Sequence, residues 1–399
     1  MVAAELGGPA WPKVIIVDET MREGMQIESA DIPLAAKVEL LNALARTGLS
    51  HIVVGSFVSP KWTPQMANVD ALLDKFQPAQ GVRYTALALN PKGRKRMERY
   101  MPPLAEPLGL PRTLVHLCDV FVRRNTNRSQ QDEIADWAGV IGQAVDEGAE
   151  SAGIAINAAW GSNWVGPFDD AYRLQMLQAQ HDAWTAAGIP VDRVWIGDPM
   201  AWNMPHQVTS TLRSIKQRWP AITTFHLHLH NARGSAPISA YAALTTLDAG
   251  DTLILDTAVG GMGGCPYCGH GRLTQMIPTE DLVDLLEELG IPTGVDLAEL
   301  LKVARLAERV VGHELWGHVS KAGQRPRGED LFAMDMPFIE TPEQAQHFWR
   351  GPSAYTGAIS PWSAPIVSPM RTAAEARARQ SDMGAPPGTG SPTPGAGGA

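Results

Sequence analysis

Residues 252–259, TLILDTAV, are the last of eight short runs rich in Val, Ile, Leu and Thr that alternate with longer helical patterns. Runs of this composition, without regular polar alternation, are typical of strands buried on both faces. Eight β–α units in succession predict a (β/α)8 TIM barrel, and an open parallel sheet is the alternative because periodicity does not show closure. The seven earlier runs are 14–20, 51–57, 83–89, 113–119, 151–157, 193–199 and 223–230.

The segments between and after these runs have helical patterns. In TEDLVDLLEELG (279–290), Thr279 is the expected N-cap and Gly290 the expected C-terminal stop. A further helical stretch, 296–312, extends the same domain. The other clear patterns are 33–48, 130–148 and 205–219.

The chain is expected to have three parts. Residues 13–323 contain the barrel. Residues 324–383 form a C-terminal extension that contains Pro and aromatic residues, and we expect it to pack on the barrel or on a neighbouring subunit. The end of the chain, GAPPGTGSPTPGAGGA (384–399), has too few apolar side chains to build a core and is predicted to be disordered.

Charge and composition exclude several classes of protein. The formal net charge of -9 disfavours non-specific binding to nucleic acid or to anionic membranes. Three cysteines in 399 residues cannot build a disulfide scaffold and indicate reduced thiols. No apolar run reaches the roughly 18 residues that span a bilayer, and the N-terminus has no signal-peptide pattern. We therefore expect a cytoplasmic protein that binds neither nucleic acid nor membranes.

Polar residues cluster where the predicted strands end. In a barrel these ends lie at one face, where catalytic groups are found, so the residues are expected to form one site. They include Glu19, Arg22, Glu23 and Gln26 after the first run, Ser59 after the second, Asp198 in the sixth, His228, His230 and Asn231 in and after the seventh, and GGMGGCPYCGHG (260–271) after the eighth.

The two histidines point to a metal. His228 and His230 are two residues apart on a strand and therefore face the same side. Two imidazoles with the Glu23 carboxylate suit a divalent cation, and Arg22 beside them could stabilise an oxyanion. His226 has the same alternation but lies deeper and is expected to be structural. The alternative is that all of these histidines are hydrogen-bonded core residues.

The motif CPYC within residues 260–271 has three interpretations: a redox dithiol, a metal knuckle or a glycine-rich active-site loop. A zinc knuckle would need a second cysteine pair, which the chain lacks. The position behind GGMGG and the eighth strand favours the loop, on which Cys268 could still form a regulatory disulfide with Cys265.

Six stretches resemble the DRE-TIM metallolyase superfamily and, within it, the hydroxymethylglutaryl-CoA lyase branch. They are DETMREGMQ, SFVSPKWTPQM, GDPMAWNMP, HLHNARG, GGMGGCPY and TEDLV, spread over roughly residues 13–323. The resemblance implies that Arg22 polarises a substrate carbonyl, that Glu23, His228 and His230 hold Mg2+ or Mn2+, and that Cys265 transfers protons from a mobile lid.

Further residues are expected to bind the substrate. Gln26, Ser59, Asp198, Asn231 and His270 are candidates because they lie at the strand ends or on the glycine-rich loop.

Two basic segments could contact an acyl-CoA. In the lyases, residues of the loops after the third and fourth strands approach CoA, which here implies Asn90, Lys92, Arg123 and Arg124. The alternative is that these residues form a solvated basic surface.

Three positions depart from the family pattern. Glu23 stands where the family usually has aspartate, and Val53 stands where the lyases have a strand-2 glutamate. The segment CGHGRLTQMIP (268–278) lacks the asparagine metal ligand, which His270, Gln275 or water could replace. Since the scaffold motifs are intact, we interpret these changes as an altered substrate or reaction.

The leading hypothesis is a divalent-metal-dependent carbon–carbon lyase that cleaves a 3-hydroxy acyl-CoA or related 3-hydroxy acid by retro-Claisen or retro-aldol chemistry through an enolate. One alternative is a Claisen-type condensing synthase, another is a non-catalytic binding protein on a lyase scaffold, and a third is a CPYC thiol oxidoreductase. The expected partner is a small-molecule substrate, and the resemblance implies a homo-oligomer.

Overall fold

The computed structural model of the chain describes residues 10–88, 90–331 and 367–383. The chain divides into two compact units, Met1–Gly323 and Gln324–Ala399. In the second unit the described elements are the short helix η7 (Gly328–Asp330) and the helix α13 (Pro369–Met383). Most of the predicted extension at 324–383 and all of the predicted tail at 384–399 lie outside the described residues.

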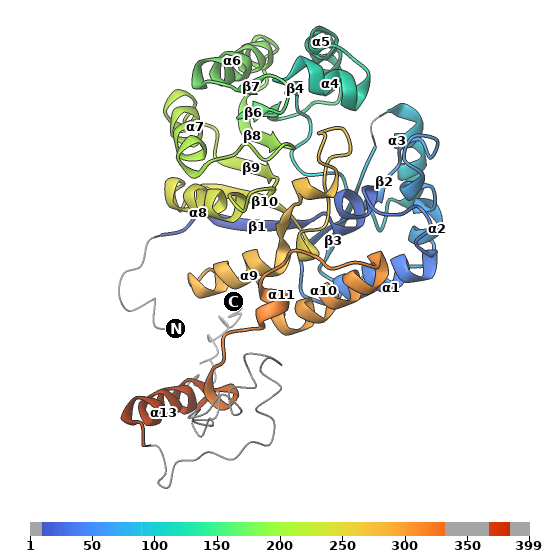
Figure 1. Ribbon diagram of the computed structural model, residues 1–399. Coiled ribbons are helices and arrows are strands. Elements are labelled where there is room, and N and C mark those ends of the chain that lie inside the picture. The colour runs from blue at the N-terminus through green and yellow to red at the C-terminus, as the bar shows by residue number, and fades with distance from the viewer. Residues whose placement is uncertain (1–9, 89, 332–366, 384–399) are drawn as a thin grey trace, which may run out of the picture. The chain divides into compact units, whose positions relative to one another are not determined.

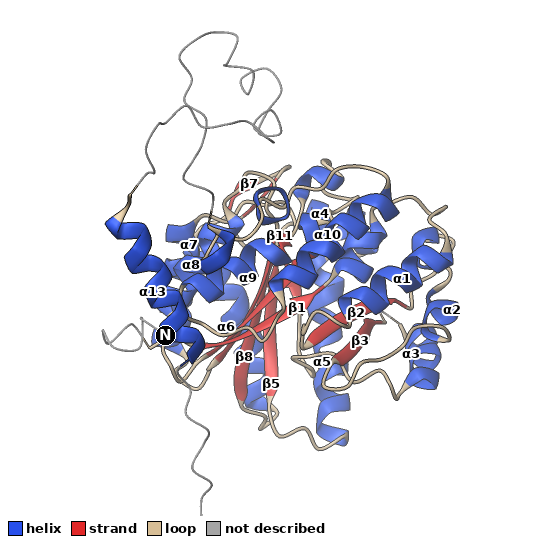
Figure 2. Ribbon diagram, turned by 90° about the horizontal axis from the view of Figure 1, so that it is seen from below, coloured by secondary structure: helices blue, strands red, loops and turns tan. Residues whose placement is uncertain are grey.

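The first unit is built around a curled parallel sheet with the strand order β3-β2-β1-β10-β9-β8-β5-β4. Helices surround these strands, as Figure 1 and Figure 2 show, so the fold is the predicted (β/α)8 barrel. The strands are β1 (Lys13–Asp18), β2 (His51–Ser56), β3 (Arg83–Leu87), β4 (Val115–His116), β5 (Ala152–Asn157), β8 (Val191–Asp198), β9 (Thr224–Leu229) and β10 (Thr252–Ala258).

Strand β4 is much shorter than the predicted run 113–119. It pairs with β5 on one side, where the Leu117 backbone N–H donates to the Asn157 carbonyl at 2.9 Å. The neighbouring His116 N–H points the other way, and the Glu133 carboxylate accepts it at 3.0 Å. The Glu133 side chain thus satisfies the N–H on the side of β4 that does not pair with β5.

The predicted helices are confirmed within a few residues of their ends. The helices of the first unit are α1 (Leu34–Leu44), α2 (Val69–Leu73), α3 (Pro91–Met97), α4 (Asp119–Thr126), α5 (Gln130–Asp146), α6 (Asp170–Ala186), α7 (Pro205–Arg218), α8 (Ala236–Thr246), α9 (Thr279–Glu288), α10 (Leu297–Val311) and α11 (Val319–Ala322). None of the helices in the described ranges has the length and apolarity needed to cross a membrane.

The prediction for the start of α9 is wrong in one detail. Pro278 is the N-cap residue, and Thr279 is the first helical residue. The Thr279 hydroxyl instead donates to the Asp18 carboxylate at 2.8 Å, which ties the helix to the end of β1. At the other end, Gly290 follows the helix with a φ of 77°, as expected for a glycine stop.

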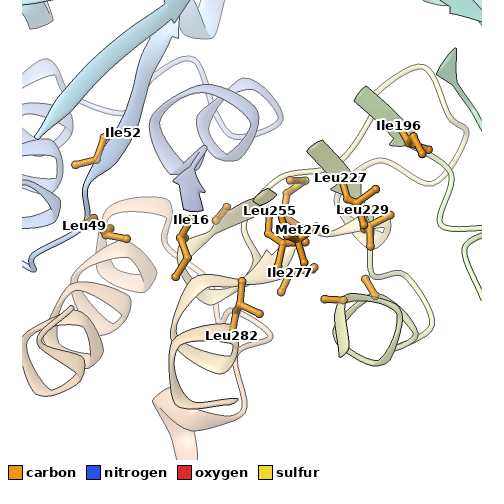
Figure 3. Close-up of a cluster of buried hydrophobic side chains, with 14 of the residues drawn as sticks. Ile16, Leu49, Ile52, Ile196, Leu227, Leu229, Leu255, Met276, Ile277 and Leu282 are labelled. Atoms are coloured by element: carbon orange, nitrogen blue, oxygen red, sulfur yellow. The ribbon is translucent and has the colours of Figure 1, made fainter. Parts of the chain in front are cut away.

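The main core lies between the sheet and its helices. Figure 3 shows Ile16, Leu227, Leu229 and Leu255 of the strands packed near Leu282 of α9. Full burial of one such side chain stabilises the fold by about 1.5–3 kcal/mol. In β9, Leu227 and Leu229 point outward to this core. Because side chains alternate along a strand, His226 and His228 point the other way, toward the barrel interior.

Candidate active site

The turn after β1 is fixed by buried hydrogen bonds. Asp18 accepts from the backbone N–H of Thr20 at 3.0 Å and from the Thr279 hydroxyl at 2.8 Å. Burial outweighs these contacts and raises the pKa of Asp18 to about 6. The Thr20 hydroxyl accepts from the Val259 N–H at 2.8 Å, so the turn is joined to the end of β10. The chain then forms one π-helical turn, η2 (Thr20–Gly24), which contains Arg22 and Glu23.

Glu23, His228 and His230 converge as the sequence predicts. The two histidine Nε2 atoms are 3.2 Å apart, and His230 Nε2 is 3.8 Å from Glu23 Oε1. One ligand atom from each residue lies within 4.8 Å of the other two, and all three side chains are buried. Within the described part of the chain, this is the one cluster of this kind that could hold a metal ion.

A carboxylate that sequence reasoning missed orients the histidines. Asp256 Oδ2 lies 2.9 Å from His228 Nδ1, and Asp256 Oδ1 lies 2.6 Å from His226 Nε2. Because Nδ1 of His228 is bonded to a carboxylate, its Nε2 lone pair faces His230 and Glu23, as a metal ligand should. An aspartate within the apolar run of β10, in register with Val17, was the available signal.

The protonation state of His230 suits a cation. Burial and the neighbouring His228 hold the pKa of His230 well below its usual value, so its imidazole is neutral at pH 7. Burial lowers the pKa of His228, but the hydrogen bond and charge of Asp256 outweigh it and raise that pKa, so a cation would compete with a proton at its Nε2. Two convergent imidazole nitrogens, a carboxylate oxygen and this supporting aspartate are a donor set that fits Mg2+ or Mn2+.

Arg22 lies beside this cluster in a double ion pair. Its Nε donates to Glu19 Oε2 at 2.6 Å, and its Nη2 donates to Glu19 Oε1 at 3.0 Å. Its Nη1 donates to Glu23 Oε2. The guanidinium is desolvated, but the charges of Glu19 and Glu23 raise its pKa above the usual value. The contact with Glu19 was not predicted, although the residue is close to Arg22 in sequence.

The glycine-rich loop packs directly on Glu23. A Cβ atom on Gly263 would lie 3.2 Å from Glu23 Cγ, and one on Gly264 would lie 2.3 Å from the Gly271 carbonyl oxygen. Both positions have positive φ, 108° and 151°, so glycine satisfies the backbone and the close approach together. Cys265 follows, 6% exposed, and its N–H donates to the Thr274 hydroxyl at 2.8 Å.

Two side chains from other segments hold the outer part of this loop. Arg124 Nε donates to the Tyr267 carbonyl at 3.1 Å, and Asn163 Nδ2 donates to the Cys268 carbonyl at 2.9 Å. Cys265 and Cys268 are both buried free thiols. These contacts hold the loop against the segments that follow β4 and β5.

The predicted substrate residues fall into two groups. Asp198 and Asn231 are buried and already bonded within loops: Asp198 accepts from the Asn203 N–H and side chain, both at 2.7 Å, and Asn231 Oδ1 accepts from Ala236 N at 3.1 Å. Gln26 is half-buried, and the side chains of Ser59 and His270 are exposed. Of the two residues that could replace the missing asparagine ligand, with water as the third candidate, His270 is exposed and Gln275 is buried.

The predicted CoA residues also differ in their contacts. Asn90 is the N-cap of α3, since its Oδ1 accepts from Gly93 N at 2.9 Å. Lys92 and Arg123 are exposed on α3 and α4. Arg124 is exposed but lies over the Trp164 ring, 5.1 Å from its centroid, as well as bonding to the loop.

The fold and the site together define a class, a (β/α)8 barrel with a candidate divalent-metal centre and an adjacent arginine at its strand ends. The HMGL-like family model matches residues 13–307, so the chain belongs to the HMGL-like family. It is a carbon–carbon lyase of the DRE-TIM metallolyase superfamily, as the motifs predict.

Individual relatives agree. The chain is 32% identical over 320 residues to the (R)-citramalyl-CoA lyase of Chloroflexus aurantiacus. This alignment covers 78% of this chain and 95% of that protein. It is 29% identical over 312 residues to the mitochondrial hydroxymethylglutaryl-CoA lyase of Mus musculus, with 78% and 89% covered.

Solved lyase structures have the same fold. The hydroxymethylglutaryl-CoA lyase of Bacillus subtilis superposes with a TM-score of 0.65 at 27% identity, over 79% of this chain and 99% of that chain. The enzyme of Acinetobacter baumannii, solved with coenzyme A and 3-methylmalate, gives a TM-score of 0.65 at 25% identity, over 81% and 97%.

Proposed function

We propose that this lyase cleaves a 3-hydroxy acyl-CoA by a divalent-metal-dependent retro-Claisen reaction. The observation that carries the proposal is the convergence of Glu23, His228 and His230 beside the guanidinium of Arg22. The relatives support the substrate class, since citramalyl-CoA and hydroxymethylglutaryl-CoA are both 3-hydroxy thioesters.

The bond changes assign roles to the chain's own residues. The substrate hydroxyl loses its proton, the bond between C2 and C3 breaks, C3 becomes a carbonyl, and the thioester leaves as an enolate that takes up a proton at C2. A cation held by Glu23, His228 and His230 would acidify the hydroxyl and polarise the oxygens bound to it. Arg22 stabilises the negative charge that develops on oxygen. Cys265, on the loop over Glu23, moves the proton between the hydroxyl and C2.

The remaining residues are assigned to binding. Gln26, Ser59, Asp198, Asn231 and His270 would contact or shape the acyl site. The residues that would approach the CoA moiety come from the segments after β3 and β4: Asn90, Lys92, Arg123 and Arg124. A homo-oligomeric state and a cytoplasmic location stay predictions.

The test is release of acetyl-CoA by purified protein from hydroxymethylglutaryl-CoA and from citramalyl-CoA, after chelation and after Mg2+ or Mn2+ is restored. We expect release that requires the metal and that falls by about 10²–10³-fold in Arg22→Ala, the usual cost of removing a donor to a developing oxyanion. Glu106→Gln, which breaks an exposed ion pair with Arg94, is the matched control and should be fully active.

Two results would contradict the proposal. A protein that binds the metal but releases acetyl-CoA from neither thioester acts on another substrate. A protein that neither binds metal nor releases acetyl-CoA supports the binding-protein alternative.

A further inference from the structure

The contact between Glu19 and Arg22 has the geometry of a positioning interaction. Both carboxylate oxygens of Glu19 are used, one by Nε and one by Nη2, at 2.6 and 3.0 Å. Such a two-point pair fixes the plane of a guanidinium as well as its distance. Glu19 is 5% exposed, so water competes little for the contact.

The pair also determines where the other end of Arg22 points. With Nε and Nη2 held by Glu19, Nη1 is directed at Glu23, one of the three candidate metal ligands. The donor that faces the site is therefore Nη1, and its direction depends on Glu19. An arginine side chain has several rotatable bonds, and without the pair its guanidinium could adopt other orientations.

Glu19 lies beside the position on the neighbouring strand where the lyases have a glutamate and this chain has Val53. The register of β1 on β2 pairs Asp18 with Ile52, which places Glu19 next to Val53. Val53 packs with Val17 and Ile254 in a small apolar cluster inside the barrel. Since Val17 is two residues before Glu19 and faces the same side, Glu19 lies at the edge of this cluster.

We propose that Glu19, directly after β1, is the positioning residue for Arg22, and that a carboxylate at the neighbouring position 53 would reach the same guanidinium from β2. This rests on the proposed function, because Arg22 is useful to the reaction only if negative charge develops at the site. Glu19 itself does not contact the reacting atoms; it acts through Arg22.

The test compares Glu19→Gln, Arg22→Ala, their double variant, Glu19→Val and the exchange Glu19→Val/Val53→Glu. We expect Glu19→Gln to lower kcat by about 10²-fold, the effect of a misplacement of roughly 1 Å at a reacting centre, with KM, Mn2+ affinity and Tm unchanged. In the Arg22→Ala background the same substitution should have no further effect, because the two residues act as one unit. The exchange should have a kcat at least about tenfold higher than that of Glu19→Val alone.

Any of three results overturns the inference: wild-type kcat in Glu19→Gln, a fall in kcat matched by losses of Mn2+ affinity or Tm, or no recovery in the exchange. A measurement without turnover separates this inference from the proposed function. The Arg22 Nε–H resonance, identified by its absence in Arg22→Ala, should exchange slowly with water in the wild type and rapidly in Glu19→Gln. If the wild type cleaves neither thioester, the proposed function fails. Equal exchange rates of the Arg22 Nε–H in the wild type and in Glu19→Gln would separately overturn the pairing of Glu19 with Arg22.

Discussion

Asp256→Asn tests how the metal centre is supported. Asp256 contacts two histidines at 2.6 and 2.9 Å, and one of them, His228, is a candidate ligand. The substitution keeps the shape of the side chain but removes the charge, which turns a charge-assisted hydrogen bond into a neutral one. That difference is about 1–1.5 kcal/mol for each bond.

The expected loss of metal affinity follows from these contacts. A loss of about 1.4 kcal/mol at His228 alone is tenfold in Kd. The amide NH2 group must also face one of the two imidazoles, which disturbs its tautomer, so the loss should reach roughly 10–100-fold. Titration of free Mn2+ followed by electron paramagnetic resonance measures this directly.

The matched control is Asp251→Asn. Asp251 is also buried and charge-paired, with Lys216, but it precedes β10 at the opposite end of the strand from the site. It should bind Mn2+ as the wild type does. A folded Asp256→Asn protein with unchanged Mn2+ affinity would refute the claim that Asp256 orients the ligand His228.

Three further predictions concern stability and the loop. Burial raises the pKa of Glu280 from 4.5 to about 7, so the folded protein holds this proton up to a higher pH than the unfolded chain does. The protonated carboxyl therefore stabilises the folded state at low pH, and this stabilisation is lost as the pH rises from about 4.5 through 7. Glu280→Gln should remove up to about 3 kcal/mol of that pH dependence, as urea unfolding at pH 5 and pH 8 would show; an unchanged difference would contradict it. If a cation binds the folded site, Mn2+ at about 100 times its Kd should add about 2.7 kcal/mol of stability, and His230→Ala should abolish the increase in Tm. Arg124→Ala removes the hydrogen bond to the Tyr267 carbonyl, which contributes about 1 kcal/mol to holding the loop closed. Amide exchange in residues 265–271 should therefore accelerate roughly fivefold, while exchange in β9 stays the same.

The barrel could be predicted because its signals are local and repeated. Each apolar run marks a strand, and eight of them between helical patterns leave few arrangements. The length of β4 could not be predicted, because it depends on pairing with β5, which is limited to Val115 and His116 and joins residues distant in sequence. Thr279 was misassigned as a cap because its true partner, Asp18, is distant in sequence.

The candidate site shows the same division. The facing pair His228 and His230 follows from strand periodicity alone. The parts played by Asp256 and Glu19 do not, because they depend on the register between strands and on the π-helical turn that brings Arg22 back over Glu19.

The most direct test of the central claim is the rate of acetyl-CoA release measured on one chelated sample as Mn2+ is added and its bound fraction is followed. We predict no release without metal and a rate that rises in proportion to occupancy of a single site per chain, formed by Glu23, His228 and His230. Release at full rate from the metal-free protein, or full occupancy of that site without any release, would contradict it.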